Sequence, residues 1–180
     1  MTTGITKLEG DTPAAWIGCL ACYNNGVLNG AWYDLTEAFD EDEIRESLEE
    51  RGECDHEELW AFDIENLPVD SECSPVDLED IPDLYAHAID AFGDDCGWEI
   101  YSKYCKEVWN AEISDMEDRF SGIWDSFDDY AYDLVDQTID LDKALGSLSN
   151  YFDYDAFARD LKYDYHVIDL DDGRVAVFGQ

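Results

Sequence analysis

The sequence has 180 residues, with 46 Asp and Glu against 10 Lys and Arg, and therefore a formal net charge of −36 at pH 7. This balance argues against direct binding to nucleic acid or anionic lipid, because both need Lys and Arg on the protein. It does not indicate disorder, because 46% of the residues are hydrophobic and 14% aromatic, whereas acidic disordered segments are poor in aromatics.

The first segment, 1–73, alternates the patterns of strands and a helix. We expect strands at 16–23, 30–33 and 59–64, the first of them followed by the turn sequence Asn24-Asn25-Gly26. Asp40, with Glu43 three residues later, predicts a capped helix that carries Ile44 and Leu48 inward and ends near Gly52. The segment is therefore expected to be a small α+β module.

The middle segment, 74–108, has the periodicity of helices. Residues 67–74 are an expected connector. Apolar residues then recur at helical spacing and predict an amphipathic helix that Gly93 ends; they are Ile81, Leu84, Tyr85, Ala88 and Phe92. A second helix is expected over 98–109, so this segment reads as a helical module.

The last segment, 109–180, returns to mixed patterns. We expect a helix at 112–120, a short extended stretch at 122–124, and a helix from Ser126, the N-cap, to about Thr138. Asp153 is expected to cap a helix through Lys162. A hairpin over 165–169 and 174–178, turning at 171–173, completes a second α+β module.

The charge suggests a shape for this α+β chain of three modules. Duplex DNA carries one negative charge per about 1.7 Å of axis, so a charge of −36 corresponds to about 60 Å of duplex. A compact globule of this length has a radius of gyration of roughly 16 Å. Matching the charge density of DNA therefore requires an elongated molecule.

Carboxylates gather on surfaces that contain almost no cations. The stretch 52–102 has no Lys or Arg and sixteen acids. On a helical wheel, Asp125, Asp129, Asp133, Asp136 and Asp140 fall within roughly 80° of one another. The opposite side carries Phe127, Ala131, Leu134, Val135 and Thr138. We expect such carboxylates to stand in for phosphates at a basic partner surface; the candidates are Asp77, Glu79, Asp80, Asp83, Asp115, Asp118, Asp125, Asp128, Asp129, Asp133, Asp136 and Asp140.

Two interpretations compete with phosphate mimicry: a merely solvated helix face, and an enzyme or binding domain adapted to high salt. Mimicry itself leaves the target open, because an acidic decoy could act on any of several DNA-binding proteins. Salt adaptation would place an acidic skin on a recognisable enzyme. The sequence has no phosphate-binding loop, dinucleotide-binding glycine motif, zinc-protease motif or nucleophile elbow. We therefore expect no catalytic residue, no enzyme activity and no cofactor.

The cysteines and histidines give no expected metal site. Residues three apart on a strand point to opposite faces, so Cys19 and Cys22 are expected to be separate thiols, in the core or half-buried. No second cysteine pair has zinc spacing, and His56, His87 and His166 are isolated. The loop 169–173 lacks the final glutamate of a calcium loop.

The sequence also predicts where the chain resides. No apolar run reaches the roughly 18 residues of a membrane span. The segment 1–11 has no apolar core of a signal peptide. We therefore expect a cytoplasmic protein with reduced thiols and no membrane partner.

Two segments resemble the ArdA antirestriction proteins. Residues 16–32, WIGCLACYNNGVLNGAW, are similar to the opening of that family, and residues 150–161, NYFDYDAFARDL, to its C-terminal helix motif. Phe120-Ser121-Gly122-Ile123-Trp124 also fits an aromatic-x-Gly-x-aromatic element of the family. The chain departs from the family pattern in its extra N-terminal residues and its cysteines.

The resemblance covers about 14–178 and carries implications for function. It implies an elongated homodimer that imitates bent B-form DNA and occupies the DNA site of type I restriction–modification enzymes, protecting mobile DNA. It also points to the C-terminal motif for the dimer surface, where the candidates are Tyr151, Phe152, Tyr154 and Phe157.

Overall fold

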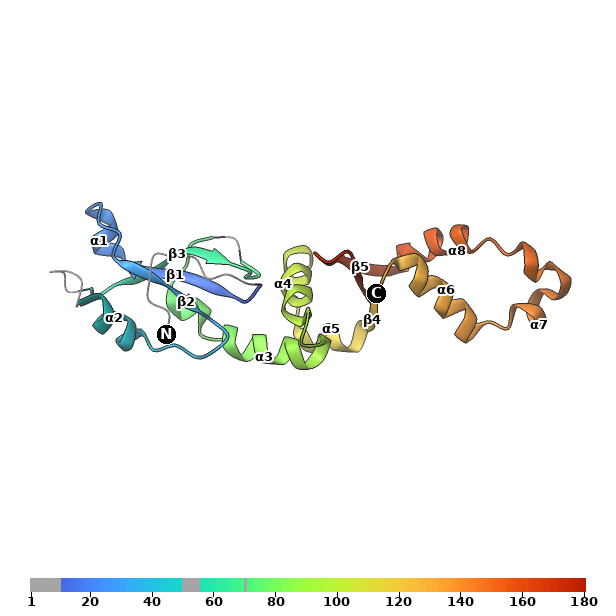
Figure 1. Ribbon diagram of the computed structural model, residues 1–180, viewed down its shortest axis with the longest axis horizontal. Helices are drawn as coiled ribbons and strands as arrows, with labels where there is room; N and C mark the ends of the chain where they lie inside the picture. The colour runs from blue at the N-terminus through green and yellow to red at the C-terminus, as the bar shows by residue number, and fades with distance from the viewer. Residues whose placement is uncertain (1–10, 50–55, 70) are drawn as a thin grey trace. The chain divides into compact units, whose positions relative to one another are not determined.

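The computed structural model describes residues 11–49, 56–69 and 71–180, which form a mixed α+β fold (Figure 1). The chain divides into two compact units, unit 1 over 1–109 and unit 2 over 110–180. The mixed α+β class is confirmed. The division into three modules and the elongated shape stay predictions.

Unit 1 is built on an antiparallel sheet of order β2-β1-β3, formed by β1 (Ala14–Cys19), β2 (Gly30–Asp34) and β3 (Leu59–Glu65). The central strand β1 is buried along its whole length. The Trp16 ring packs against Phe62 with centroids 5.7 Å apart. It also lies so close to Gly30 that a Cβ there would come within 2.6 Å of the ring. These positions agree with the strands expected at 30–33 and 59–64.

The strand expected at 16–23 is wrong beyond Cys19, because a short helix, α1 (Leu20–Asn24), begins there. The backbone N–H of Cys22 donates to Cys19 Sγ at 3.4 Å, so the cysteine caps the helix. The expected turn follows this helix, and Gly26 takes the positive φ of 78° that the turn requires. Local capping therefore ends the strand before the apolar run ends.

Besides α1, the described residues of unit 1 form the helices α2 (Glu41–Glu49), η1 (Pro75–Leu78), α3 (Ile81–Phe92) and α4 (Gly97–Glu107). Asp40 Oδ1 accepts a hydrogen bond from the backbone N–H of Asp42 at 2.8 Å, and Ile44 and Leu48 are buried as expected. The expected end of α2 near Gly52 lies outside the described residues. Gly93 follows α3 directly, which agrees with the predicted stop.

Unit 2 contains an antiparallel sheet of order β4-β6-β5, formed by β4 (Phe120–Trp124), β5 (Tyr165–Asp169) and β6 (Val175–Gly179). Its helices are α5 (Ile113–Arg119), α6 (Phe127–Thr138), α7 (Leu141–Leu145), η2 (Gly146–Tyr151), α8 (Tyr154–Leu161) and η3 (Lys162–Asp164). The hydrophobic core joins α6 and α8 to the sheet through Phe127, Ala131, Ala158, Val175 and Val177. The hairpin and the caps at Ser126 and Asp153 are confirmed, whereas α7 and η2 were not expected.

Within the described ranges, no helix has both the length and the apolar character needed to span a membrane.

Candidate acidic interface

Helix α6 carries the candidate phosphate-mimicking carboxylates of unit 2 on a well-anchored backbone. Its N-cap is Ser126, whose Oγ accepts from the backbone N–H of Asp129 at 3.2 Å. Phe127, Tyr130, Ala131 and Val135 are buried on one side of the helix. The other side is left to the acids, as the helical wheel predicted.

The acidic stripe, which is the set of five aspartates on the wheel from Asp125 to Asp140, differs from the prediction at both ends. Because α6 ends at Thr138, Asp125 and Asp140 lie outside it; Asp140 instead caps α7 by accepting from the backbone N–H of Lys143 at 3.0 Å. Thr138, expected on the buried side, is exposed, and its hydroxyl donates to the carbonyl of Leu134. Within α6 the acids that remain are Asp128, Asp129, Asp133 and Asp136.

The twelve candidate carboxylates lie at the surface, in two separate sets. Asp77, Glu79, Asp80 and Asp83 lie around η1 and the start of α3 in unit 1, and the other eight lie in unit 2. Eleven are exposed, and Asp133 is half-buried. None of the twelve forms an ion pair with a Lys, Arg or His of the described ranges. Their charges are therefore left uncompensated by the described cations.

A contact between α6 and α8 extends the acidic face in a way that sequence reasoning missed. The Tyr132 hydroxyl donates to Asp155 Oδ1 at 2.6 Å, and the Tyr154 hydroxyl donates to Asp136 Oδ1 at 3.4 Å. Asp155 is exposed, so it adds a carboxylate beside those of α6. Its place in the first turn after the Asp153 cap could have indicated an exposed acid, but not its proximity to α6.

These tyrosines respond to the negative surroundings. The hydrogen bond to Asp155 is the main cause that raises the pKa of Tyr132 to about 12, with desolvation and the charges of Asp155, Asp128 and Asp129 adding to it. Desolvation, followed by the charge of Asp136 and the hydrogen bond to it, raises the pKa of Tyr154. Both phenols therefore stay protonated at neutral pH and remain hydrogen-bond donors to the carboxylates.

The candidate dimer residues run from the end of η2, at Tyr151, through Phe152 to Tyr154 and Phe157 in α8. Tyr151 is 82% exposed, whereas Phe152, Tyr154 and Phe157 are half-buried. The Phe152 ring contacts both Tyr154 and Phe157, with centroids 4.8 and 5.7 Å apart. Leu145 and Leu148, at 41% and 62%, add exposed apolar surface to the same α7–η2 segment.

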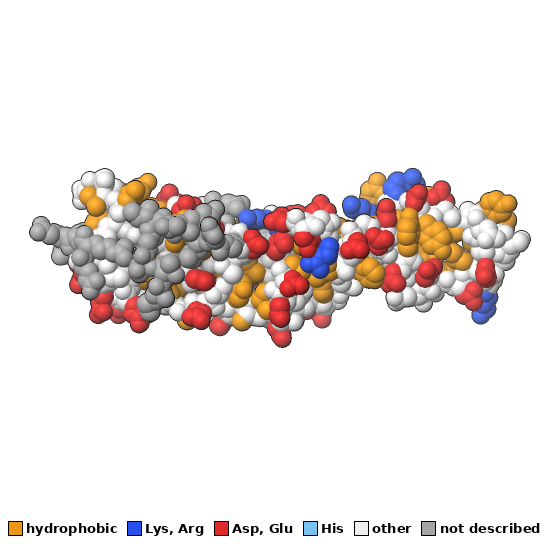
Figure 2. Space-filling model, viewed as in Figure 1, with side chains coloured by type: hydrophobic (Ala, Val, Ile, Leu, Met, Phe, Trp, Pro, Cys, Tyr) orange, Lys and Arg blue, Asp and Glu red, His pale blue; other side chains and the backbone are white. Residues whose placement is uncertain are grey.

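The described part of the visible face carries many Asp and Glu side chains and few Lys and Arg (Figure 2).

No curated protein matches the chain significantly. A family model described as "Antirestriction protein (ArdA)" matches residues 15–176, nearly the whole chain. That match agrees with the motifs at 16–32 and 150–161, because both lie within the matched residues. The chain therefore belongs to the ArdA family of antirestriction proteins, which are inhibitors rather than known enzymes.

Proposed function

We propose that the chain is a DNA mimic that occupies the DNA-binding surface of a type I restriction–modification enzyme. Membership of the ArdA family implies an antirestriction function and an interaction with restriction–modification enzymes. The observation that carries the proposal is that twelve surface carboxylates form no ion pair with the described cations. A basic DNA-binding surface could pair with them without first breaking an ion pair within the described part of the inhibitor.

The spacing of the acids on α6 supports the same proposal. Asp129 and Asp133 are four residues apart, which is about 6 Å along the helix axis, and Asp133 and Asp136 are three apart, about 4.5 Å. Phosphates follow one another at about 3.4 Å of rise on each DNA strand, so the two spacings are of the same order. Each carboxylate would accept charge-assisted hydrogen bonds from Arg or Lys, and the binding energy would be shared among many contacts.

The proposal predicts competition with DNA that depends on salt. Adding the purified protein to a type I enzyme bound to labelled target DNA should displace the DNA, because both ligands occupy one basic surface. The affinity should fall as salt rises, since the Debye length is about 8 Å at physiological ionic strength and shorter above it. Fluorescence anisotropy of the labelled DNA, repeated over a salt series, measures both effects.

Two outcomes would contradict this competition. An affinity that is unchanged between low and high salt would argue against carboxylates as phosphate substitutes. Binding of the protein to bare DNA, measured by gel shift without the enzyme, would place it in a different functional class. The enzyme alone with DNA is the control for both measurements.

We also propose that the working form is a homodimer that uses the exposed apolar surface of the α7–η2 segment. Tyr151→Asp combined with Leu148→Asp should convert the dimer to a monomer, because each change places a charge on apolar surface that the partner would bury. Light scattering coupled to size-exclusion chromatography measures the mass. Tyr163→Asp is the control, because Tyr163 is 80% exposed in the same unit but outside the segment. A variant that keeps the dimer mass would place the interface elsewhere.

A further inference from the structure

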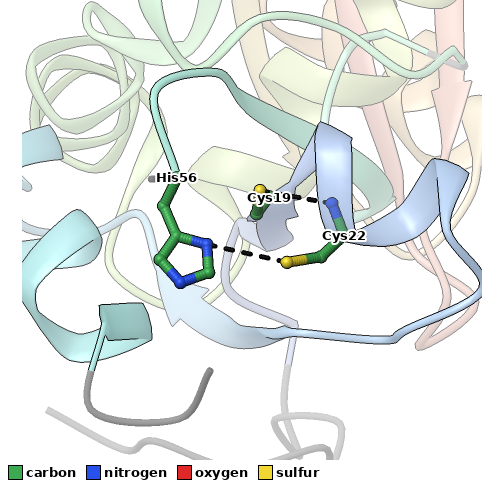
Figure 3. Close-up of side chains that lie close together, drawn as sticks. All are labelled: Cys19, Cys22 and His56. Carbon is green, nitrogen blue, oxygen red and sulfur yellow. Dashed lines mark hydrogen bonds between the residues drawn. The ribbon is translucent and has the colours of Figure 1, made fainter. Parts of the chain in front are cut away.

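Three side chains with metal-binding atoms meet in unit 1: Cys19, Cys22 and His56 (Figure 3). Their sulfur and nitrogen ligand atoms all lie within 4.8 Å of one another. Cys22 Sγ is 3.7 Å from Nδ1 of His56. All three residues are buried, and His56 has no exposed surface. The cluster lies outside the acidic interface and plays no part in the function proposed above.

The fold brings these residues together by two separate routes. Because β1 ends at Cys19 and α1 begins at the next residue, the backbone turns and places Cys22 on the same side as Cys19. His56 arrives from the loop before β3, which pairs with β1 in the register Cys19 with Leu59. The backbone hydrogen bond from Leu20 to the carbonyl of Glu58, 3.0 Å long, fixes this approach. The corrected end of β1 is therefore the feature that creates the cluster.

The surroundings of His56 are unusual for a histidine that is merely packed in a core. Its Nε2 atom is buried without a hydrogen-bond partner among the described residues. Its backbone has φ of +44°, in the left-handed region that residues other than glycine seldom adopt. Buried polar side-chain atoms are normally hydrogen-bonded, and each exception needs an explanation. The ring atom that faces Cys22 Sγ is Nδ1, so a metal ion bound there would fix the proton on Nε2, which would then need a separate acceptor.

We propose that Cys19, Cys22 and His56 bind a Zn²⁺ ion. A tetrahedral ion with thiolate sulfur at about 2.3 Å and imidazole nitrogen at about 2.0–2.1 Å separates these ligand atoms by roughly 3.6 Å. The observed 3.7 Å between Cys22 Sγ and His56 Nδ1 is close to that separation. The hydrogen bond from Cys22 N–H to Cys19 Sγ would hold the sulfur in place. Water or another donor would complete the coordination.

The donor set also selects the kind of metal. Two sulfurs and one imidazole suit Zn²⁺, whereas Mg²⁺ and Ca²⁺ prefer oxygen ligands. The ion would tie the β1–α1 corner to the segment that enters β3, and so it would stabilise unit 1. Such a structural role needs no catalysis and is independent of whether the protein inhibits a restriction enzyme.

Cobalt substitution tests the site in the full-length protein. Reduced protein should bind Co²⁺ and then show the thiolate-to-metal charge-transfer band and the visible d–d absorption of a tetrahedral site. Zn²⁺ should displace the Co²⁺, with about one ion bound per chain. Excess Mg²⁺ must be present throughout, because a chain of net charge −36 attracts divalent cations to its carboxylates. Oxygen-bound Co²⁺ gives no thiolate charge-transfer band, so carboxylate binding is distinguishable.

Substitutions assign the signal to these residues. Cys22→Ser and His56→Ala should each lower the affinity for Co²⁺ at least about 10-fold, because each removes a ligand. Cys73→Ser and Cys105→Ser are matched controls, since both are half-buried cysteines of unit 1 outside the cluster, and should leave the spectrum unchanged. Because a ligand variant could fail to fold, the wild-type melting temperature is also followed, and it should rise with Zn²⁺ and fall with a chelator.

Three results would overturn the proposal: no thiolate–cobalt band in the reduced wild-type protein, a band that survives in both ligand variants, or a wild-type melting temperature that Zn²⁺ does not change. Mass spectrometry of the protein as purified reports whether Cys19 and Cys22 have instead joined in a disulfide. A disulfide that persists after treatment with reductant would also exclude the metal site.

Discussion

Replacing Asp125, Asp129, Asp133, Asp136 and Asp140 together with Asn is expected to weaken inhibition of a type I enzyme by roughly 30- to 140-fold. An exposed ion pair is worth about 0–1 kcal/mol, so five lost pairs amount to about 2–3 kcal/mol, and about 1.4 kcal/mol corresponds to a factor of ten. Each single change should alter inhibition only a few-fold for the same reason. Inhibition constants measured at fixed salt for the single and combined variants check this result.

A second combined variant separates the position of the charges from their number. Glu43, Glu46, Glu49, Glu57 and Glu58 are exposed acids of unit 1 that lie outside the candidate set, and changing them to Gln alters the charge equally. Both variants have a formal net charge of −31 instead of −36. We expect the Gln variant to keep most of its inhibition. Equal losses in the two variants would mean that overall charge, rather than this stripe, drives binding.

The stability of the Asn variant should hold or rise. Asn caps helices about as well as Asp, so α7 keeps its cap at position 140. Repulsion between Asp129 and Asp133, four residues apart on α6, is removed at a gain of about 0.2–0.5 kcal/mol. Full inhibition by this variant would mean that the five aspartates only keep the surface hydrated and do not bind the enzyme. Lost inhibition together with a lower melting temperature would instead mean that these aspartates are needed for a stable fold.

The sequence predicted those parts of the fold that local chemistry determines. Ser126 and Asp153 each have a side-chain oxygen that caps the next turn, and both helices begin where those residues indicated. Gly93 and Gly173 adopt positive φ values of 105° and 92°, which explains the predicted helix stop and hairpin turn. The exposed acids of α6 followed from the same reasoning, because its apolar residues define the buried side.

The remaining features depend on contacts that no local pattern carries. His56 reaches Cys22 across 34 residues, through the pairing of β3 with β1. The contact between Tyr132 and Asp155 spans 23 residues and depends on how α8 packs against α6. Residues 141–151 form α7 and η2 without a buried residue, so no apolar periodicity marked them. The wheel placed Thr138 on the buried side, but Thr138 is the last residue of α6 and is exposed, because a wheel shows the direction of a side chain and not how far the packed core extends along the helix.

The largest loss of stability is expected for Val135→Asp, on the buried side of α6. Val135 has no exposed surface, so the new carboxylate would be buried without a partner or would force the helix from its sheet. The free energy of unfolding of unit 2 should fall by about 4 kcal/mol or more, which is large beside the total stability of a small domain. Urea unfolding followed by far-ultraviolet circular dichroism measures the change.

Thr138→Asp is the matched control, because it places the same charge on the same helix only three residues later. Thr138 is exposed, so the carboxylate would stay hydrated, and its repulsion by the negative end of the helix should cost no more than about 1 kcal/mol. The sequence wheel, which put both residues on the buried side, predicts two comparable losses. A large loss for Val135→Asp with a small one for Thr138→Asp would support the observed exposure of Thr138 at the end of α6. Comparable losses would mean that Thr138 is buried in the folded protein.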